Sequence, residues 1–169
     1  MVVKNVANSV VLIGMPGAGK STLGVLLAKN LAKDFLDTDL LLQARIGTTL
    51  QEFMDEHGYL RLREEEGEVL KGQDFNHSII ATGGSAVYSD DGMKSIAQFG
   101  PRVFLSITYE TLLGRVKNQG ERGIACPPGY SLKDIYDERQ ALYEKYADIT
   151  VKIDDTTLEE AVKRVIAAL

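Results

Sequence analysis

The chain has 169 residues, of which 44% are hydrophobic and 25% charged, and its 19 basic and 24 acidic residues give a net charge of −5. This length and composition are ordinary for one soluble domain with a proper core. The acidic balance argues against a broad nucleic-acid-binding surface. No apolar run approaches the roughly 18 residues of a membrane span, and the single cysteine, Cys126, excludes an internal disulfide. We therefore expect a cytoplasmic protein that binds neither membranes nor nucleic acids.

Short, continuously apolar runs alternate along the chain with segments of helical periodicity. In chain order the pattern predicts a strand at 9–14, a helix at 21–33, a strand at 34–39, helices from Leu40, at 48–58 and at 60–72, a strand at 77–82, a helix at 89–100, a strand at 102–107, helices at 108–117 and 131–147, a strand at 149–153 and a helix at 157–169. This alternation indicates a three-layer α/β/α domain whose five-stranded parallel sheet has the first strand at its centre. No repeat or linker divides residues 1–169, so we expect one domain.

One stretch, NQGERGIACPPGY at 118–130, has no periodicity and contains three glycines and two adjacent prolines. Irregular segments of this length are uncommon in compact domains, where they serve as lids or binding loops or are disordered. Residues 118–130 are therefore either a plain surface loop or a mobile lid. Cys126 lies within this stretch, and we assign it no role.

The segment GMPGAGKS, residues 14–21, fits the phosphate-binding pattern of Gly, four residues and Gly-Lys-Ser/Thr, and it lies between a predicted strand and a predicted helix. Glycines let backbone N–H groups face the phosphates, and the N-terminus of the following helix adds positive charge. Lys20 would reach the outer phosphates, and the Ser21 hydroxyl would bind Mg²⁺. The predicted nucleotide-binding residues of this loop are Gly17, Ala18, Gly19, Lys20, Ser21 and Thr22. The alternative is a glycine-rich turn that binds nothing, but chance matches in this context are rare.

In many nucleotide hydrolases a later strand ends in the acid that steadies Mg²⁺, but here the third predicted strand runs into Thr82-Gly83-Gly84-Ser85, without a carboxylate. FLDTD, residues 35–39, offers Asp37 and Asp39 instead. Side chains at i and i+2 of an extended chain point the same way, so both acids would face the cleft where ligands bind in open α/β sheets. We expect Asp37 to order Mg²⁺ and Asp39 to bind an acceptor hydroxyl. Alternatively, Asp37 caps the helix from Leu40 and Asp39 favours its dipole.

At this point a family resemblance appears. GMPGAGKST, FLDTD, the Arg63 and Glu66 pair in LRLREEE, ATGGSAV, GERGI and ERQALYEKYAD resemble, in order and spacing, the shikimate kinase family, a small relative of the nucleoside monophosphate kinases. The resemblance spans Gly14 to Asp148, whereas gluconate and adenylate kinases share the phosphate loop but carry different downstream motifs. It implies a P-loop kinase fold, ATP and Mg²⁺ as cofactors, and phosphoryl transfer to the 3-hydroxyl of shikimate in aromatic amino-acid biosynthesis.

The resemblance also implies roles for single residues. Asp39 would hold the acceptor hydroxyl and take its proton, while the Arg63 and Arg139 side chains would grip the shikimate carboxylate. The implied substrate-binding residues are Asp39, Arg63, Gly83, Gly84 and Arg139, the glycines acting through their backbone. The helices at about 40–72 would therefore bind the acceptor.

On the nucleotide side, the resemblance implies that Arg115 lies along the adenine and that Arg122 enters from a mobile lid at about 118–130. The implied catalytic residues are Lys20, Asp39 and Arg122, and the implied Mg²⁺ ligands are Ser21 and Asp37. We expect a monomer with a small-molecule substrate.

Planar guanidinium groups suit a carboxylate-bearing acceptor better than ammonium groups do. Taken alone, however, Arg63 is also compatible with a solvated helix face on which Glu66 lies at i+3, and Arg139 is compatible with a similar polar face. A mobile arginine such as Arg122, flanked by glycines, suits stabilisation of charge on a transferring phosphoryl group.

The chain departs from the family pattern near the acceptor and the lid, at Tyr59, Leu62, Ser85, Gly123 and Ala141. These departures leave a second hypothesis open, a kinase of the same fold that phosphorylates another small hydroxy compound or a nucleotide. A third hypothesis, a nucleotide-dependent switch, lacks the guanine-reading Asn-Lys-x-Asp motif.

Overall fold

The computed structural model describes residues 8–119 and 124–169. Five parallel strands form one sheet in the order β2-β3-β1-β4-β5. They are β1 (Val10–Ile13), β2 (Asp34–Asp37), β3 (Ser78–Ala81), β4 (Arg102–Ser106) and β5 (Ile149–Lys152). The predicted α/β fold with a five-stranded parallel sheet and the first strand at its centre is thereby confirmed.

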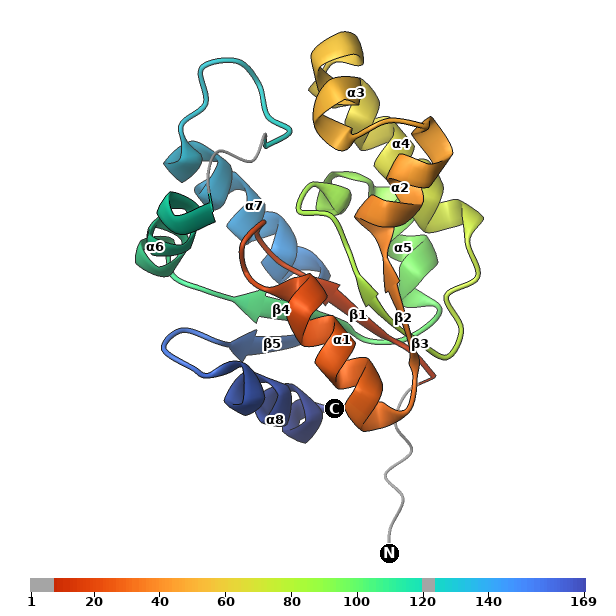
Figure 1. Ribbon diagram of the computed structural model, residues 1–169, viewed down its shortest axis with the longest axis vertical. Coiled ribbons are helices and arrows are strands. Elements are labelled where there is room, and N and C mark those ends of the chain that lie inside the picture. The colour runs from red at the N-terminus through yellow and green to blue at the C-terminus, as the bar shows by residue number, and fades with distance from the viewer. Residues whose placement is uncertain (1–7, 120–123) are drawn as a thin grey trace, which may run out of the picture.

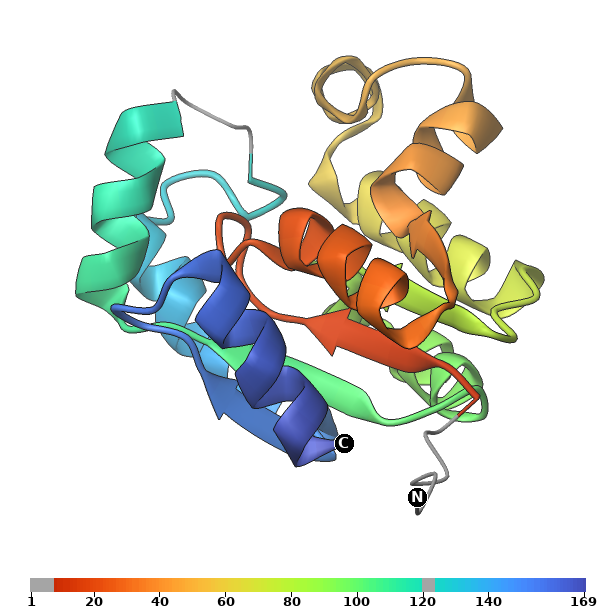
Figure 2. The ribbon, with the colours of Figure 1, turned by 60° about the horizontal axis from the view of Figure 1, so that its bottom comes forward.

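Helices cover both faces of the sheet. They are α1 (Lys20–Leu31), α2 (Thr38–Ile46), α3 (Leu50–His57), α4 (Tyr59–Gly72), the 3₁₀ helix η1 (Ala86–Tyr88), α5 (Asp90–Ala97), α6 (Tyr109–Gln119), α7 (Leu132–Tyr146) and α8 (Leu158–Ala168). Helices α1 and α8 lie on one face and α5 and α7 on the other, as Figures 1 and 2 show. No helix in the described ranges has the length and apolar character to cross a membrane.

The core is built on strands that are buried on both faces. All four residues of β1 are fully buried, as are the residues of β3, which explains why these runs are continuously apolar rather than alternating. Each large apolar side chain so buried contributes about 1.5–3 kcal/mol. Since parallel strands end at the same edge of a sheet, the segments that follow β1, β2 and β3 are brought together at their carboxyl ends.

The sequence-based expectation of an extended FLDTD segment is wrong. Strand β2 ends at Asp37 and α2 begins at Thr38, two residues before the expected Leu40. The reason is the helix cap, because the Asp37 carboxylate accepts a hydrogen bond from the Asp39 backbone N–H at 2.9 Å. Asp37 and Asp39 are therefore a cap and a first-turn residue, not two neighbours on one strand face.

Helix α6 runs through Gln119, two residues beyond the expected end at 117, so the first two residues of the expected lid belong to a helix. The next described residue is Ile124. Arg122 and Gly123 lie outside the described residues.

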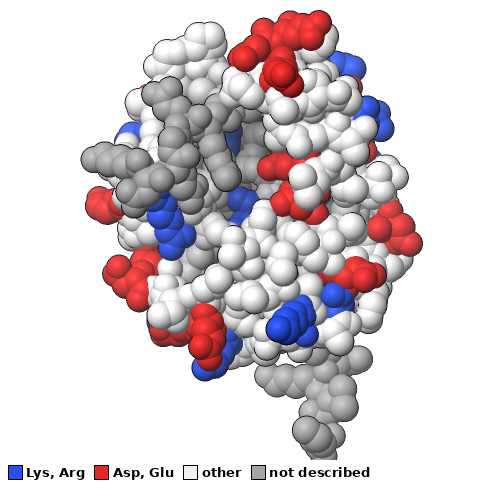
Figure 3. Space-filling view, in the orientation of Figure 1, with Lys and Arg blue, Asp and Glu red and all other residues white. Residues whose placement is uncertain are grey.

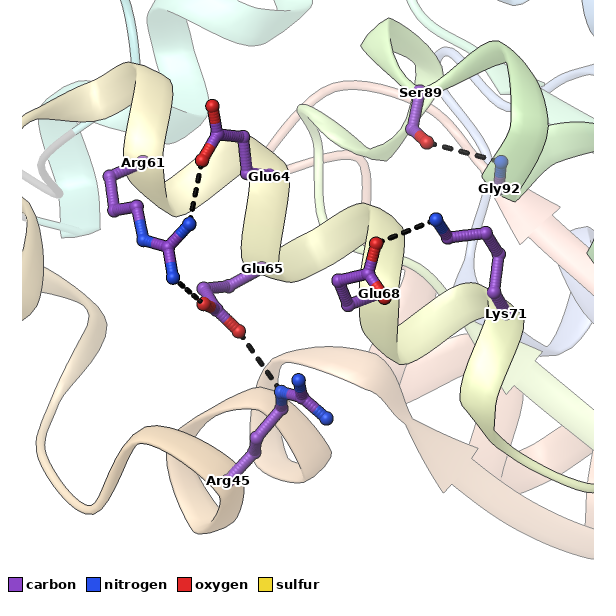
Figure 4. A network of polar contacts seen from close by, with 8 residues as sticks. All are labelled: Arg45, Arg61, Glu64, Glu65, Glu68, Lys71, Ser89 and Gly92. Atoms are coloured by element: carbon purple, nitrogen blue, oxygen red, sulfur yellow. Dashed lines mark hydrogen bonds and ion pairs between the residues drawn. The ribbon is translucent and has the colours of Figure 1, made fainter.

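Helices α2, α3 and α4 form a lobe on the β2 side of the phosphate loop, opposite α6 (Figure 2). A small second core of Leu42, Leu62, Val69 and Ala125 joins this lobe to the segment after Ile124. On its outer side Glu65 accepts from Arg45 of α2 at 3.0 Å and from Arg61 of α4 at 2.6 Å, which ties the two helices together (Figure 4).

Candidate active site

The phosphate-loop segment connects β1 to α1, as predicted. Its glycines adopt conformations that suit glycine, with φ of 149° at Gly14, 87° at Gly17 and 92° at Gly19, the last being the N-cap of α1. A Cβ on Gly14 would also lie 2.9 Å from the Leu105 carbonyl oxygen. The loop thus leads directly into the N-terminus of a twelve-residue helix, which is the arrangement that binds anions.

Lys20 lies inside this loop with its ammonium group buried. Its Nζ donates to the backbone oxygens of Gly14 at 2.7 Å and Met15 at 2.9 Å. Burial lowers the pKa of Lys20 from 10.5 to about 8, although the nearby Asp39 carboxylate acts in the opposite direction. A phosphate placed in the loop would replace the lost hydration of this ammonium group.

Ser21 and Asp37 meet although they are far apart in the chain. The Ser21 hydroxyl donates to Asp37 Oδ2 at 2.6 Å. Two oxygen ligands side by side, next to a phosphate loop, fit Mg²⁺, which takes few protein oxygens and completes its octahedron with water and phosphate. The donor set is therefore suited to the implied metal.

A cavity of about 650 Å³ extends from the phosphate loop toward α2, α3 and α7, a size typical of ligand pockets. Figure 3 shows a hollow between the α6–α7 side and the α2–α3 side, with basic side chains in its depth and acidic side chains on its α2 wall. Of the predicted site residues, the lining includes Gly17, Gly19, Lys20, Ser21, Thr22, Asp39, Gly84 and Arg139, but not Ala18, Asp37, Arg63, Gly83 or Arg115.

The TGGS segment after β3 requires a bare backbone. A Cβ on Gly83 would lie 2.7 Å from Asp39 Oδ1 and would also collide with Glu66. The Gly83 N–H donates to the Thr38 hydroxyl at 3.0 Å, and the Gly84 carbonyl accepts from the Tyr143 hydroxyl at 2.6 Å. A side chain at position 83 would therefore displace the Asp39 and Glu66 carboxylates, whereas the Asp37 carboxylate stands at the end of β2 beside Ser21.

Glu66 is a charged residue of the described cavity lining that the sequence analysis did not assign to the site. It is 7% exposed and lines the cavity, where the Ser85 hydroxyl donates to its carboxylate. Burial raises the pKa of Glu66 from 4.5 to about 7. The nearby Asp39 raises this pKa further, while the Ser85 hydrogen bond and the cations Arg139 and Arg63 oppose the shift. The solvated helix face considered above therefore does not describe Glu66. The signal that could have identified it is its pairing with Arg63 in LRLREEE, one of the motifs that carry the family resemblance.

Arg63 and Arg139 come together from α4 and α7. Each donates from Nη2 to the carbonyl oxygen of Ala125 at 2.9 Å. Arg139 is only 1% exposed. Within the described residues, the buried Nε of each arginine has no hydrogen-bond partner. Buried N–H groups that remain unpaired in the protein are the donors that a bound carboxylate would satisfy.

Arg115 of α6 lies at the other end of the site. Its Nη1 donates to the carbonyl oxygens of Gly17 and Ala18, both at 3.1 Å. The side chain thus contacts the phosphate loop from α6, which lies on the other side of the loop from α2, α3 and α4 (Figure 1).

Fold and site together define a P-loop kinase that acts on a small molecule: a phosphate loop faces a polar cavity whose lining includes Asp39, Glu66 and Arg139. Residues 16–169 match the shikimate kinase family. The chain is 34% identical over 159 residues to a shikimate kinase of Aquifex aeolicus, covering 94% of each chain, and 30% identical over 164 residues to one of Enterococcus faecalis, covering 95% of this chain and 98% of the relative. The chain belongs to the shikimate kinase family.

Solved structures agree with this placement. A crystal structure of the Aquifex aeolicus shikimate kinase has a TM-score of 0.80 at 33% identity and 95% coverage of both chains. A shikimate kinase from Acinetobacter baumannii in complex with shikimate has a TM-score of 0.80 at 25% identity, covering 96% of this chain and 92% of that one. A gluconokinase from Sinorhizobium meliloti, with a TM-score of 0.60 and 19% identity, shares the fold.

Proposed function

We propose that the protein transfers the γ-phosphoryl group of ATP to the 3-hydroxyl of shikimate, with Mg²⁺ as the metal ion. The observation that carries this proposal is the single cavity that joins the phosphate loop to Asp39 and Arg139. A phosphoryl donor and a carboxylate-bearing acceptor can therefore meet within it.

On the donor side, the loop N–H groups and the α1 N-terminus would hold the phosphates, and the Lys20 ammonium would turn from its backbone carbonyls to the outer phosphates. Ser21 and Asp37 would hold Mg²⁺, either directly or through water. The chemistry of the metal would be to neutralise charge on the outer phosphates. Arg115 would support the adenine side, since it already contacts the loop.

On the acceptor side, Asp39 would accept a hydrogen bond from the attacking hydroxyl and take its proton. This role is supported by the position of Asp39 on the cavity wall next to the Gly83 backbone. The Arg139 and Arg63 guanidinium groups would bind the carboxylate, whose charge makes such hydrogen bonds roughly twice as strong as neutral ones. Gly83 and Gly84 would contact the acceptor through their backbone.

We also propose that helices α2 to α4 form the acceptor-binding part of one kinase domain, that 118–130 acts as a lid, and that Arg122 stabilises the transferring phosphoryl group. The assignment of Arg122 rests on the family resemblance and on the use of arginine in other phosphoryl transfers. A monomer in the cytoplasm remains our expectation.

The acceptor is tested by measuring ADP formation with shikimate, gluconate and a nucleoside monophosphate at millimolar concentration. We expect turnover with shikimate alone and none in Lys20→Ala, because positioning and charge stabilisation carry phosphoryl transfer. Arg63→Ala should raise the KM for shikimate roughly ten- to a hundredfold and leave the KM for ATP unchanged. Turnover of another acceptor in place of shikimate would refute the substrate and preserve the kinase.

A further inference from the structure

The Arg63 guanidinium group packs against two tyrosine rings. Its Cζ lies 3.5 Å from the ring centroid of Tyr88, at the end of η1, and 4.9 Å from that of Tyr59, at the start of α4. A separation of 3.5 Å is van der Waals contact, well inside the range of about 6 Å within which a cation is attracted to an aromatic face. The half-buried charge of Arg63 is therefore stabilised by aromatic faces.

Arg63 forms no ion pair with a carboxylate in the part of the chain that the structure describes. Its one hydrogen bond there runs from Nη2 to the Ala125 carbonyl, and its Nε is buried without a partner. The donors of a guanidinium group lie in its plane, whereas a stacked ring covers its face. Stacking thus holds the group in place and leaves in-plane donors for a ligand.

Tyr88 is itself held by α7, the helix that carries Arg139. Its hydroxyl donates to the Glu138 carboxylate of α7, and the Arg139 Cζ lies 5.5 Å from its ring centroid. Figure 1 shows the segment of η1 between α4 and α7, the helices that carry Arg63 and Arg139. One ring thus contacts both arginines, while its hydroxyl fixes its orientation.

We propose that Tyr88 is a positioning residue for acceptor binding, whose ring, anchored through Glu138, holds the Arg63 guanidinium so that its N–H groups meet the acceptor carboxylate. This inference rests on the proposed function, because it requires a carboxylate-bearing acceptor. It makes the aromatic side chain at 88 a determinant of acceptor affinity that does not touch the nucleotide.

The test compares Tyr88→Leu with Tyr88→Phe and with Tyr109→Leu as control. Tyr109 of α6 has a cation–π contact of its own, since its ring centroid lies 5.5 Å from the Lys133 ammonium rather than near Arg63 or Arg139. We expect Tyr88→Leu to raise the KM for shikimate about 3- to 30-fold, the loss of one partly desolvated cation–π contact. The kcat and the KM for ATP should stay within about twofold. Tyr88→Phe, which keeps the ring, should recover most of the affinity, and Tyr109→Leu should change neither KM. If Tyr88→Leu does not fold, Tyr88→Gln replaces it at this half-exposed position.

A merely structural role for Tyr88 is excluded by two further readouts. With the methyl ester of shikimate, which lacks the carboxylate charge, Tyr88→Leu should have little effect. In an Arg63→Ala background, Tyr88→Leu should add little to the KM. Equal losses for acid and ester, or additive effects of the two substitutions, would overturn the role of Tyr88 and leave shikimate phosphorylation standing. A wild-type protein that neither binds nor phosphorylates shikimate would overturn the proposed function and this inference with it.

Discussion

Asp37 combines two tasks at one residue, since one carboxylate oxygen caps α2 and the other accepts the Ser21 hydroxyl. The capping interpretation, which the structure confirms, and the proposed metal-ligand role, which the sequence presents as alternatives, are therefore compatible. A capping aspartate is held rigidly by the helix that it starts. This rigidity is useful in a metal ligand, because the oxygen is in place before the ion arrives.

The Asp37→Asn substitution tests the proposed metal-binding role of Asp37 separately from its role as a helix cap. Asparagine caps helices as well as aspartate does, so the melting temperature should change little. Magnesium-dependent turnover should fall roughly 10- to 100-fold, as it does when groups around a metal are altered, and should partly recover at high Mg²⁺. Asp37→Ala, the comparison variant, should lose about 1 kcal/mol of stability as well. Normal magnesium dependence in Asp37→Asn would remove Asp37 from the metal site.

Glu66 predicts a pH dependence of stability. Its pKa of about 7 in the folded protein exceeds the ordinary 4.5, so the folded state keeps a proton that the unfolded chain loses between these values. The stabilisation is complete below about pH 4.5 and is lost as pH rises to about 7, with a slope of at most about 1.4 kcal/mol per pH unit. The charged groups that face Glu66 include Asp39, Arg63, Arg139 and the Lys20 ammonium, whose own pKa is lowered to about 8, so the test stays below about pH 7.

Glu66→Gln should abolish most of this decline, as measured by urea unfolding at several values between about pH 5 and pH 7. Glu68→Gln is the matched control on the same helix, since Glu68 is exposed and pairs with Lys71, which lowers its pKa. A wild-type protein whose stability is flat over this range would contradict the raised pKa of Glu66.

At the scale of elements, the geometry of the lobe formed by α2, α3 and α4 depends on the relative placement of α2 and α4. Helix α2 carries Asp39, and α4 carries Arg63 and Glu66. The contacts that join them are the small apolar core around Leu42 and Leu62 and the bridge from Arg45 through Glu65. Single exposed ion pairs contribute little to the free energy of unfolding. We therefore expect the Arg45–Glu65 ion pair to affect the relative position of α2 and α4 rather than the global stability.

Glu65→Ala should therefore raise the KM for the acceptor a few-fold, with the KM for ATP unchanged and faster amide exchange in α2. Glu68→Ala serves as its control, because Glu68 pairs with Lys71 inside α4 and links no second helix (Figure 4). Equal effects of the two variants would show that the Arg45–Glu65 bridge does not position the lobe.

At the scale of the whole molecule, the start of β1 joins distant parts of the chain. The Ser9 hydroxyl donates to the Phe75 carbonyl at 2.6 Å and accepts the Ser78 N–H at 3.0 Å, while the Ser9 N–H donates to the Phe99 carbonyl at 3.1 Å. Gly100 passes so close to the Ser9 backbone that a Cβ at residue 100 would collide with its carbonyl oxygen.

Gly100→Ala should therefore destabilise the fold by more than about 2 kcal/mol, because backbone on both sides must move. In thermal unfolding this corresponds to a decrease of roughly 5 °C or more. Gly114→Ala is the control, at an α6 glycine with open space around it, and should be neutral or stabilising by up to about 1 kcal/mol. A Gly100→Ala variant as stable as the wild type would contradict this close approach.

The local sequence pattern was sufficient to predict much of the fold of this protein. Short apolar runs alternating with amphipathic segments predict the order of elements and the parallel sheet. The signal is clearest at the sheet centre, where β1 is buried on both faces, and weaker at the edge strands β2 and β5. The phosphate loop can also be recognised from a local pattern. Its glycines, Lys20 and Ser21 lie close together in the chain, and together they form one short turn between a strand and a helix.

Only the tertiary structure shows what depends on the direction of side chains from separate elements. It places Glu66 in the buried wall of the cavity, turns Asp39 into a helical residue beside Gly83, and brings Arg63 and Arg139 to the carbonyl oxygen of Ala125. A polar helical segment such as LRLREEE has charged residues on most of its circumference, so periodicity cannot tell which of them faces water. That choice is made by the packing of α4 against α2, η1 and the Ala125 segment, whose contacts join residues far apart in the chain.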